Sequence, residues 1–414
     1  MRTLCQELAH LEIESVVTAP GVESRQYEVD GQRVVRYQTG EHVKLHDLYG
    51  EGDAVATANA ALVLEAESPD IVHFHAYTSG VSLRLAREVK RRGIPLIQTY
   101  HTPTVSCLRG TLLYLGREIC DGVVEPRRCA ECLLEAKGVP LWARRVVVAA
   151  SGLIPLGERQ GAAWTAMRIP ELARHRSACF QELMRRVDRV VAVCDWAAEL
   201  LKRNGVDPTK IIVSRQGTQL ATSSHPLSGH REGRDVRLVF MGRLDETKGL
   251  HTVLSALEGL PADNISLDIY GVAQGSTPYV ERIRRMATAD NRIRLRPPVA
   301  PGEIVSTIAN YEALVVPSVW LETGPLVVYE AFAAGVPVIG SRLGGIAELV
   351  THERDGLLVR AEDAPAWRAV FAGIASDKSI LAKLREGIRP PRTMAEVAAD
   401  MSQLYRQVLE SVAA

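Results

Sequence analysis

Several features that would assign this chain to particular classes of protein are missing. Its 49 Lys and Arg residues are matched by 49 Asp and Glu, which removes the bulk electrostatic argument for nucleic-acid binding. No apolar run reaches the roughly 18 residues that predict a transmembrane helix. The first 15 residues mix charged and apolar types, unlike a secretory signal, so we expect a cytoplasmic protein.

Internal repeats and low-complexity segments are also absent, and what remains is the composition of an ordinary globular protein. Hydrophobic residues make up 46% of the chain and charged residues 24%. At 414 residues the chain is too long for one hydrophobic core and suits two domains of roughly 200 residues each.

Short β-branched runs alternate with longer helical patterns, which predicts an α/β fold. In the first half we predict strands at Ile13–Thr18, Ile71–His75, Ile94–Thr99 and Val190–Cys194. In the second half we predict them around Phe240 and at Leu267–Tyr270, Leu314–Val316 and Val336–Ile339. The polar segment between the halves, Gly217–Asp235, is rich in Ser, His and Gly and suggests a linker.

Two carboxylates surround the start of a predicted helix in the second half. Glu322 follows a buried strand, and Pro325 suits the first helical position because its missing N–H costs nothing there. Gly335 marks the end of the helix, and Glu330 lies about a turn and a half inside it. A helix start attracts phosphate, and a carboxylate accepts the hydroxyls of a ribose. Taken alone, the two glutamates are better explained as solvated surface charges.

A second turn carries two cations. The apolar strand Val236–Met241 runs into a turn that contains Gly242, Arg243 and Lys248, and a helical pattern follows at Leu250–Leu257. The two cations could neutralise a diphosphate and stabilise charge on a departing nucleotide. Surface loops often carry such residues, so this turn is a weak signal by itself.

Together these segments resemble the retaining glycosyltransferases of the GT-B fold, in the family-4 or group 1 type, whose signature places two glutamates around such a helix start. The resemblance implies that Glu322 approaches hydroxyls of the donor sugar and that Glu330 binds the ribose. It also implies that Gly242, Arg243 and Lys248 form the diphosphate site. The backbone that would hold sugar and diphosphate comprises Thr323, Gly324, Pro325, Leu326 and Val327.

For the whole chain, the resemblance implies two Rossmann-like domains with parallel sheets that face each other across a cleft. We expect an acceptor-side domain at residues 1–220, with a cysteine-bearing insert at 105–140, and a nucleotide-sugar domain at 235–390. The helical pattern within 391–414 is expected to cross back to the first domain. The family's first strand and glycine-rich loop are absent before the helical pattern Leu4–Leu11. We therefore expect that the chain begins downstream of its natural start; the alternative is that the protein lacks this strand.

Histidines end two predicted strands of the first half, where ligands gather in open α/β sheets. We interpret His73 and His75 as structural residues. His101 is the candidate site residue, because it resembles the histidine that the family places against the donor sugar and its phosphate.

Four of the seven cysteines lie close together in the sequence. They are Cys107, Cys120, Cys129 and Cys132. The Cys-x-x-Cys pair and the two further thiols could bind a structural zinc ion; reduced cysteines without a ligand, or an iron–sulfur or redox role, are the alternatives. We expect Cys5, Cys179 and Cys194 to be small core residues.

We therefore expect an enzyme that uses a nucleotide-sugar donor, without a catalytic cofactor, to glycosylate a hydroxyl of a glycan, a lipid-linked or a small-molecule acceptor. No Asp-x-Asp motif occurs, so the usual carboxylate site for a metal on the diphosphate is missing. The alternatives are a nucleotide-sugar 2-epimerase and a catalytically silent glycosyltransferase-like binding protein. An excess of cations between His101 and Val190, with an apolar stretch at Val146–Leu156, suits peripheral contact with the inner face of a membrane, or merely a solvated helical hairpin.

Overall fold

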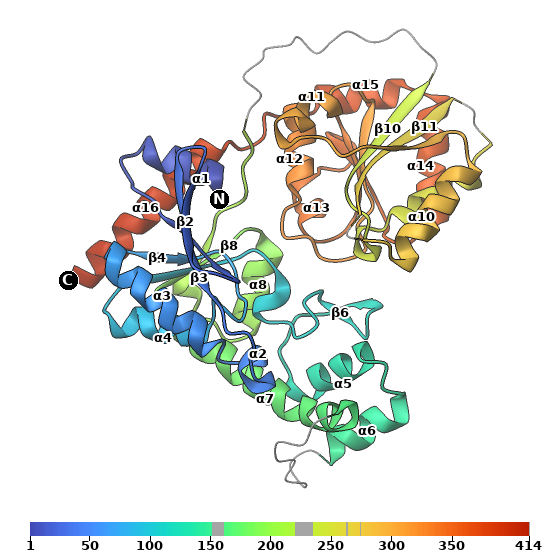
Figure 1. The fold of residues 1–414 in the computed structure, drawn as a ribbon. Coiled ribbons are helices and arrows are strands. Elements are labelled where there is room, and N and C mark those ends of the chain that lie inside the picture. The colour runs from blue at the N-terminus through green and yellow to red at the C-terminus, as the bar shows by residue number, and fades with distance from the viewer. Residues whose placement is uncertain (151–160, 220–234, 262–263, 274, 414) are drawn as a thin grey trace. The chain divides into compact units, whose positions relative to one another are not determined.

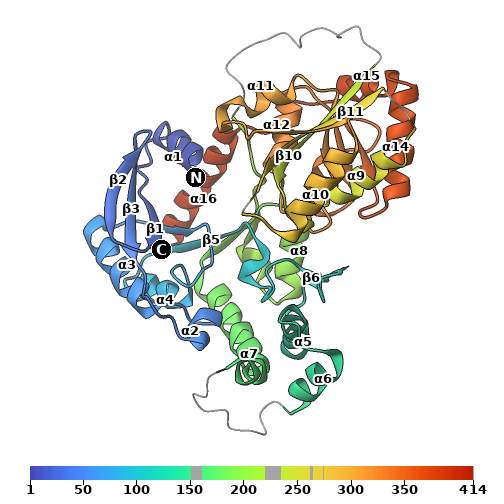
Figure 2. The ribbon, with the colours of Figure 1, turned by 45° about the vertical axis from the view of Figure 1, so that its right-hand side comes forward.

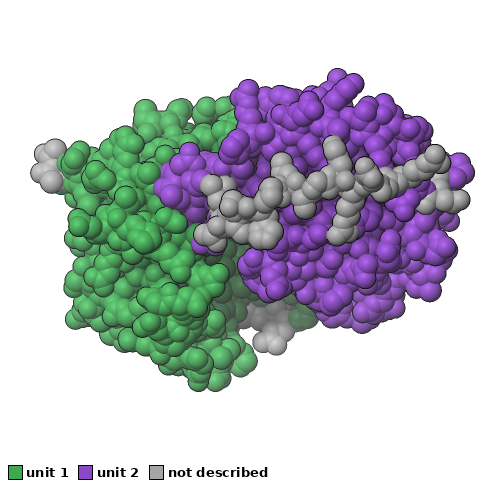
Figure 3. Space-filling view, turned by 90° about the horizontal axis from the view of Figure 1, so that it is seen from above, with its two compact units in different colours: residues 1–215, 397–414 green, residues 216–396 purple. Residues whose placement is uncertain are grey.

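The computed structural model describes residues 1–150, 161–219, 235–261, 264–273 and 275–413. The chain divides into two compact units, which Figure 3 colours separately. Unit 1 comprises Met1–Arg215 with Val397–Ala414, and unit 2 comprises Gln216–Glu396. Most of the expected linker lies outside the described residues.

Unit 2 is built on a six-stranded parallel sheet with the strand order β12-β11-β10-β13-β14-β15. Its central strands β10 and β13 are largely apolar, as expected where both faces of a sheet are covered, whereas the edge strand β12 is mostly exposed. In the register, Phe240 pairs with Ile269 and Leu314 pairs with Val338. The strands are β10 (Val236–Arg243), β11 (Ile265–Val272), β12 (Ile293–Arg296), β13 (Ala313–Val316), β14 (Val338–Ser341) and β15 (Gly356–Val359).

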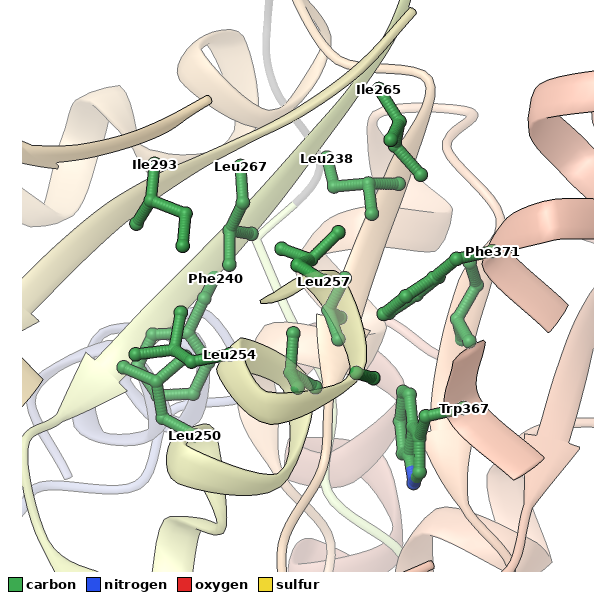
Figure 4. Close-up of a cluster of buried hydrophobic side chains, with 14 of the residues drawn as sticks. Leu238, Phe240, Leu250, Leu254, Leu257, Ile265, Leu267, Ile293, Trp367 and Phe371 are labelled. Atoms are coloured by element: carbon green, nitrogen blue, oxygen red, sulfur yellow. The ribbon is translucent and has the colours of Figure 1, made fainter. Parts of the chain in front are cut away.

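Helices cover both faces of this sheet (Figures 1 and 2). Leu238 and Phe240 pack with Trp367 and Phe371 in one apolar cluster, shown in Figure 4, whereas Val239 belongs to the cluster on the opposite face. This alternation is the two-residue period of a strand. The first face carries α9 (Leu250–Glu258), α10 (Pro278–Ala289), α14 (Ala364–Ser376) and α15 (Ser379–Glu386); the second carries α11 (Ile304–Ile308), α12 (Leu326–Ala333) and α13 (Gly344–Leu349).

The strands of unit 1 form two larger sheets and a small hairpin. One sheet has the order β1-β3-β2, and the other has four parallel strands in the order β4-β5-β8-β9. The strands are β1 (Val17–Gly21), β2 (Arg25–Val29), β3 (Gln32–Gln38), β4 (Val72–Phe74), β5 (Leu96–Tyr100), β8 (Arg189–Ala192) and β9 (Ile211–Val213), and the hairpin is β6 (Leu113–Tyr114) with β7 (Glu118–Ile119).

The start of the chain differs in part from its prediction. A helix precedes the first strand, as expected, but the strand predicted at Ile13–Thr18 begins only at Val17. The N–H of Ile13 donates to the Leu8 carbonyl, and Glu12 adopts a left-handed φ of 61°. These contacts prolong the turn that ends the helix, and the strand therefore starts later.

The helices of unit 1 include a last helix that extends from unit 2. Met401, Leu404 and Val408 of this helix are buried, as its periodicity predicts, and Asp400 accepts a hydrogen bond from Ser214. Across the described residues, no helix combines the length and apolarity needed to cross a membrane. The helices are α1 (Arg2–Ala9), α2 (Leu45–Tyr49), α3 (Ala54–Glu67), α4 (Leu83–Arg91), α5 (Pro126–Ala136), α6 (Leu141–Ala149), α7 (Ala162–Arg186), α8 (Asp195–Arg203) and α16 (Met394–Ala413).

Candidate functional site

Three loops of unit 2 follow the carboxyl ends of adjacent parallel strands, where ligands bind in sheets of this kind. The loop after β10 contains the 3₁₀ turn Glu246–Lys248, the loop after β13 leads into α12, and the loop after β14 leads into α13. The structure therefore brings the candidate residues of the second half to one edge of the sheet.

Backbone hydrogen bonds hold these loops together. The Val319 N–H donates to the Thr247 carbonyl at 2.9 Å, and the Gly345 N–H donates to the Glu322 carbonyl at 2.7 Å. Gly249 has a left-handed φ of 65°, and a Cβ there would lie 2.0 Å from a carbonyl oxygen of the second loop. The close approach of the loops thus depends on glycine.

The Glu322 carboxylate is buried and accepts three hydrogen bonds at one oxygen. Its Oε1 lies 2.6 Å from Lys248 Nζ, 2.8 Å from Ser318 Oγ and 2.8 Å from Trp320 Nε1. The Lys248 ammonium also lies 5.7 Å from the centroid of the Trp320 ring, a cation–π contact. The side chains of the ion pair are only 20% and 8% exposed, so solvent screens it weakly.

Lys248 has a protein partner that the sequence-based assignment does not include, and its role at a diphosphate stays a prediction. That assignment places the ammonium at a diphosphate, whereas in the structure it is paired with Glu322, because the first two loops lie side by side. Arg243, at the last position of β10, is exposed and has no ion-pair partner within the described parts of the chain. The charge of Arg243 is therefore directly available to an anion.

Helix α12 presents its amino end to the same loops. Pro325 is its N-cap, so the helix begins at Leu326, one position after the start that the sequence predicts. The Val328 N–H donates to the Pro325 carbonyl at 3.0 Å, which leaves the two preceding N–H groups at the end of the helix, where an anion is favoured. Glu330 follows one turn later, and burial raises the pKa of its carboxyl group.

Three histidines of unit 1 lie together at the carboxyl ends of β4 and β5. His75 Nδ1 is 3.0 Å from His101 Nε2, and the ring centroids of His73 and His75 are 4.0 Å apart. The ring nitrogens of His73 are both bonded, Nδ1 to the Tyr405 hydroxyl at 2.8 Å and Nε2 to the Thr99 hydroxyl at 2.7 Å. These contacts agree with a structural role for His73, which ties α16 to the sheet.

Burial keeps this histidine cluster neutral. It lowers the pKa of His73 to about 3 and of His101 to about 4, and it lowers the pKa of His75 well below its usual value. At neutral pH each imidazole can therefore donate one hydrogen bond and accept one, but it carries no charge. The role of His101 at a donor sugar stays a prediction.

The four clustered cysteines surround the hairpin and the first turns of α5, and none forms a disulfide. The Leu115 N–H lies 3.3 Å from Cys132 Sγ, and the Gly122 N–H lies 3.5 Å from Cys120 Sγ. Burial and negative charge on the other three thiols raise the pKa of Cys129 to about 11. Within the described residues, no three or more His, Cys, Asp or Glu side chains are placed to hold a metal ion. Cys5, Cys179 and Cys194 are buried, as expected of core residues.

The sequence pattern misses several neighbours of these sites. Ser318 and Trp320 both donate to Glu322, and Tyr405 binds His73 across 332 residues of sequence. The available signal for Trp320 is its position two residues before Glu322, in a chain with only five tryptophans. Nothing local marks Tyr405, because its partner lies at the other end of the chain.

The fold and the site define the class of protein. Two units with parallel sheets, a last helix that begins in one and ends in the other, and a loop cluster with a paired carboxylate at the strand ends are the features of the GT-B glycosyltransferases. The chain belongs to this family: residues 228–389 match the glycosyl transferases group 1, and residues 1–217 match the glycosyl transferase 4-like domain.

Curated relatives include two kinds of glycosyltransferase. The chain is similar to a D-inositol 3-phosphate glycosyltransferase of Corynebacterium efficiens, with 30% identity over 56% of this chain and 59% of that protein. It is also similar to the putative colanic acid biosynthesis glycosyltransferase WcaL of Salmonella typhimurium, with 28% identity over 58% of this chain and 61% of that protein. In both comparisons the chain spans about three fifths of the relative's length.

Solved structures confirm the predicted fold class. The Anabaena protein HepE in complex with UDP-glucose has a TM-score of 0.61 at 16% identity, over 99% of this chain and 95% of that chain. The sucrose-phosphate synthase of Thermosynechococcus elongatus has a TM-score of 0.67 at 18% identity, over 99% and 92%. At these identities the likeness shows the GT-B fold alone.

Gly345→Ala should disrupt the crossing of the second and third loops. The added Cβ would lie 2.6 Å from the Glu322 carbonyl oxygen and 2.8 Å from the Gly324 nitrogen, so the backbone must shift. We expect the free energy of unfolding to fall by about 1–3 kcal/mol, measured by urea denaturation. Gly373→Ala is the matched control, since a Cβ there meets nothing within 4 Å, and within α14 it should stabilise by about 0.5–1 kcal/mol. Equal stabilities of the two variants would contradict the crowding at Gly345.

Proposed function

We propose that this protein is a retaining, metal-independent glycosyltransferase that moves a sugar from a nucleotide-sugar donor to an acceptor hydroxyl. The observation that carries the proposal is the buried Glu322 carboxylate beside the amino end of α12, with Glu330 on the same helix. The match of residues 228–389 to the glycosyl transferases group 1 supports it.

In the proposed donor complex, the diphosphate lies at the amino end of α12 and against Arg243. The helix N–H groups and the exposed guanidinium there supply complementary positive charge. Glu330 accepts the ribose hydroxyls and Glu322 accepts hydroxyls of the sugar, while backbone from Thr323 to Val327 lines the space between them. His101, kept neutral by burial, is assigned to the donor sugar.

The proposed reaction breaks the bond between the anomeric carbon and the diphosphate oxygen. Negative charge grows on the leaving nucleotide, and Arg243, Lys248 and the helix terminus stabilise it without the metal site that Asp-x-Asp would provide. The acceptor oxygen attacks from the side of the leaving group, and a donor phosphate oxygen takes its proton. The new bond therefore keeps the donor's anomeric configuration.

The acceptor is assigned to hydroxyl-bearing molecules as a class, namely a glycan, a lipid-linked acceptor or a small molecule. The names of the relatives support this class, since they refer to an inositol phosphate and to the biosynthesis of colanic acid. No donor base is assigned.

A donor panel tests the proposed function. UDP-, GDP- and ADP-sugars should be assayed for release of nucleotide, with and without a panel of sugar and polyol acceptors. We expect acceptor-dependent release with one base and an α-linked product from an α-linked donor. Release of a free sugar epimer without acceptor would instead indicate a 2-epimerase, and nucleotide binding without turnover over the whole panel would indicate a silent binding protein.

Glu330→Ala should weaken nucleotide binding by about 1.5–3 kcal/mol, the range for hydrogen bonds to a charged group. Isothermal titration with the nucleotide that the panel identifies measures this change. Glu258→Ala, at an exposed position of α9, is the control and should leave the affinity unaltered. Unchanged affinity of Glu330→Ala would show that the ribose is held elsewhere.

We also propose that Cys107, Cys120, Cys129 and Cys132 hold a structural zinc ion. The hairpin they surround has strands of two residues, too short to be stable alone, and backbone N–H groups already point at two of the sulfurs. Binding requires the four sulfurs to close around one ion. Four thiolates would leave no open position, so the ion would stabilise the fold and take no part in the reaction.

Elemental analysis of protein purified without chelator tests the zinc site. We expect about one zinc per chain, lost in the Cys129→Ser/Cys132→Ser double variant and kept in Cys5→Ala, which alters a buried cysteine outside the cluster. Zinc-free wild-type protein that is fully folded would refute the site.

A further inference from the structure

Trp320 lies next to the proposed donor site but has no role in the proposed reaction. Its indole N–H donates to Glu322 Oε1 at 2.8 Å, and its ring lies beside the Lys248 ammonium. The side chain therefore touches both members of the buried ion pair from the same loop that carries the carboxylate.

The number of donors on Glu322 Oε1 indicates what the tryptophan does. Lys248, Ser318 and Trp320 all donate to this one oxygen. Ser318 is 1% exposed and Glu322 is 7% exposed, so water does not readily replace a lost donor here. Such a carboxylate is held in one rotamer, with one oxygen committed to the protein.

Of the three donors, Lys248 is the one that a bound diphosphate would attract away from Glu322. Its ammonium carries three N–H groups on a flexible stem, and a diphosphate at the amino end of α12 would compete with Glu322 for it. Once the ammonium is shared, the indole N–H and the serine hydroxyl still donate to Oε1. The indole is rigid and bulky, so it retains its direction when the lysine moves.

We propose that Trp320 is a positioning residue, which fixes the Glu322 carboxylate for the donor sugar through its indole N–H and guides the Lys248 ammonium with its ring. This inference rests on the proposed function for its consequence in catalysis. The contact itself is independent of that function. The inference predicts that Trp320 affects the rate of sugar transfer and not the affinity for the nucleotide.

The first test needs no substrate. Trp320→Phe removes the N–H and keeps a ring, and Glu322→Leu removes the acceptor while keeping a side chain of similar size. A double-mutant cycle on the unfolding equilibrium should show that the two changes couple, with the effect of Trp320→Phe at least about fivefold smaller in the Glu322→Leu background. Additive effects would overturn the proposal, whatever the protein's activity.

The second test uses the donor identified by the panel. Trp320→Phe should lower kcat/KM for sugar transfer by about tenfold or more, while the Kd for the free nucleotide stays within about twofold. Replacing Trp320 by 3-benzothienylalanine, in which sulfur takes the place of N–H, should reproduce the loss with the shape of the side chain kept. Trp142→Phe, at a residue that is 73% exposed on α6, is the matched control and should change neither quantity.

The possible results test the proposed function and the positioning role of Trp320 separately. Coupling between Trp320 and Glu322 with no turnover of any donor would refute the proposed function and keep the positioning contact. Turnover with an unchanged kcat/KM in both Trp320 variants would refute the positioning role. If nucleotide affinity fell as much as kcat/KM, Trp320 would act on the whole loop. This result would also refute the inference.

Discussion

The buried ion pair between Lys248 and Glu322 is the interaction around which the site of unit 2 is organised. A carboxylate that is almost wholly removed from water must be compensated, and here an ammonium and two neutral donors meet at one of its oxygens. The pair can form only because a backbone hydrogen bond joins the first loop to the second, and glycines permit the close crossing. The position of the ion pair therefore depends on the glycines that let the loop backbones approach each other closely.

The candidate site of unit 1 also consists of buried ionisable side chains, but these are kept uncharged. Its three imidazoles lie together, and burial holds them neutral. They are linked by hydrogen bonds to each other and to hydroxyl groups. Unit 2 thus offers charges and a helix terminus, which suit a diphosphate, whereas unit 1 offers neutral groups, which suit hydroxyls.

Much of the fold could be predicted because its signals are local. The apolar runs of β10, β11, β13 and β14 are bounded by turn residues, and Gly335 ends α12 with a left-handed φ of 68°. Polar strands such as β2, whose side chains are largely exposed, carry no apolar period and were not predicted. The strand expected at Ile13–Thr18 was placed too early, since a β-branched run cannot reveal a helix cap that folds back onto it.

The sequence by itself determined the family, the α/β class and the identity of the residues at the strand ends, because these depend on residue types at short spacings. Only the tertiary structure decided which of these residues meet. It paired Lys248 with Glu322 over 74 positions, brought the Trp320 indole to both, and joined His73 to Tyr405 across 332 positions. Such contacts follow from the packing of loops and helices that are distant in sequence, and no local pattern encodes the direction in which a buried side chain finally points.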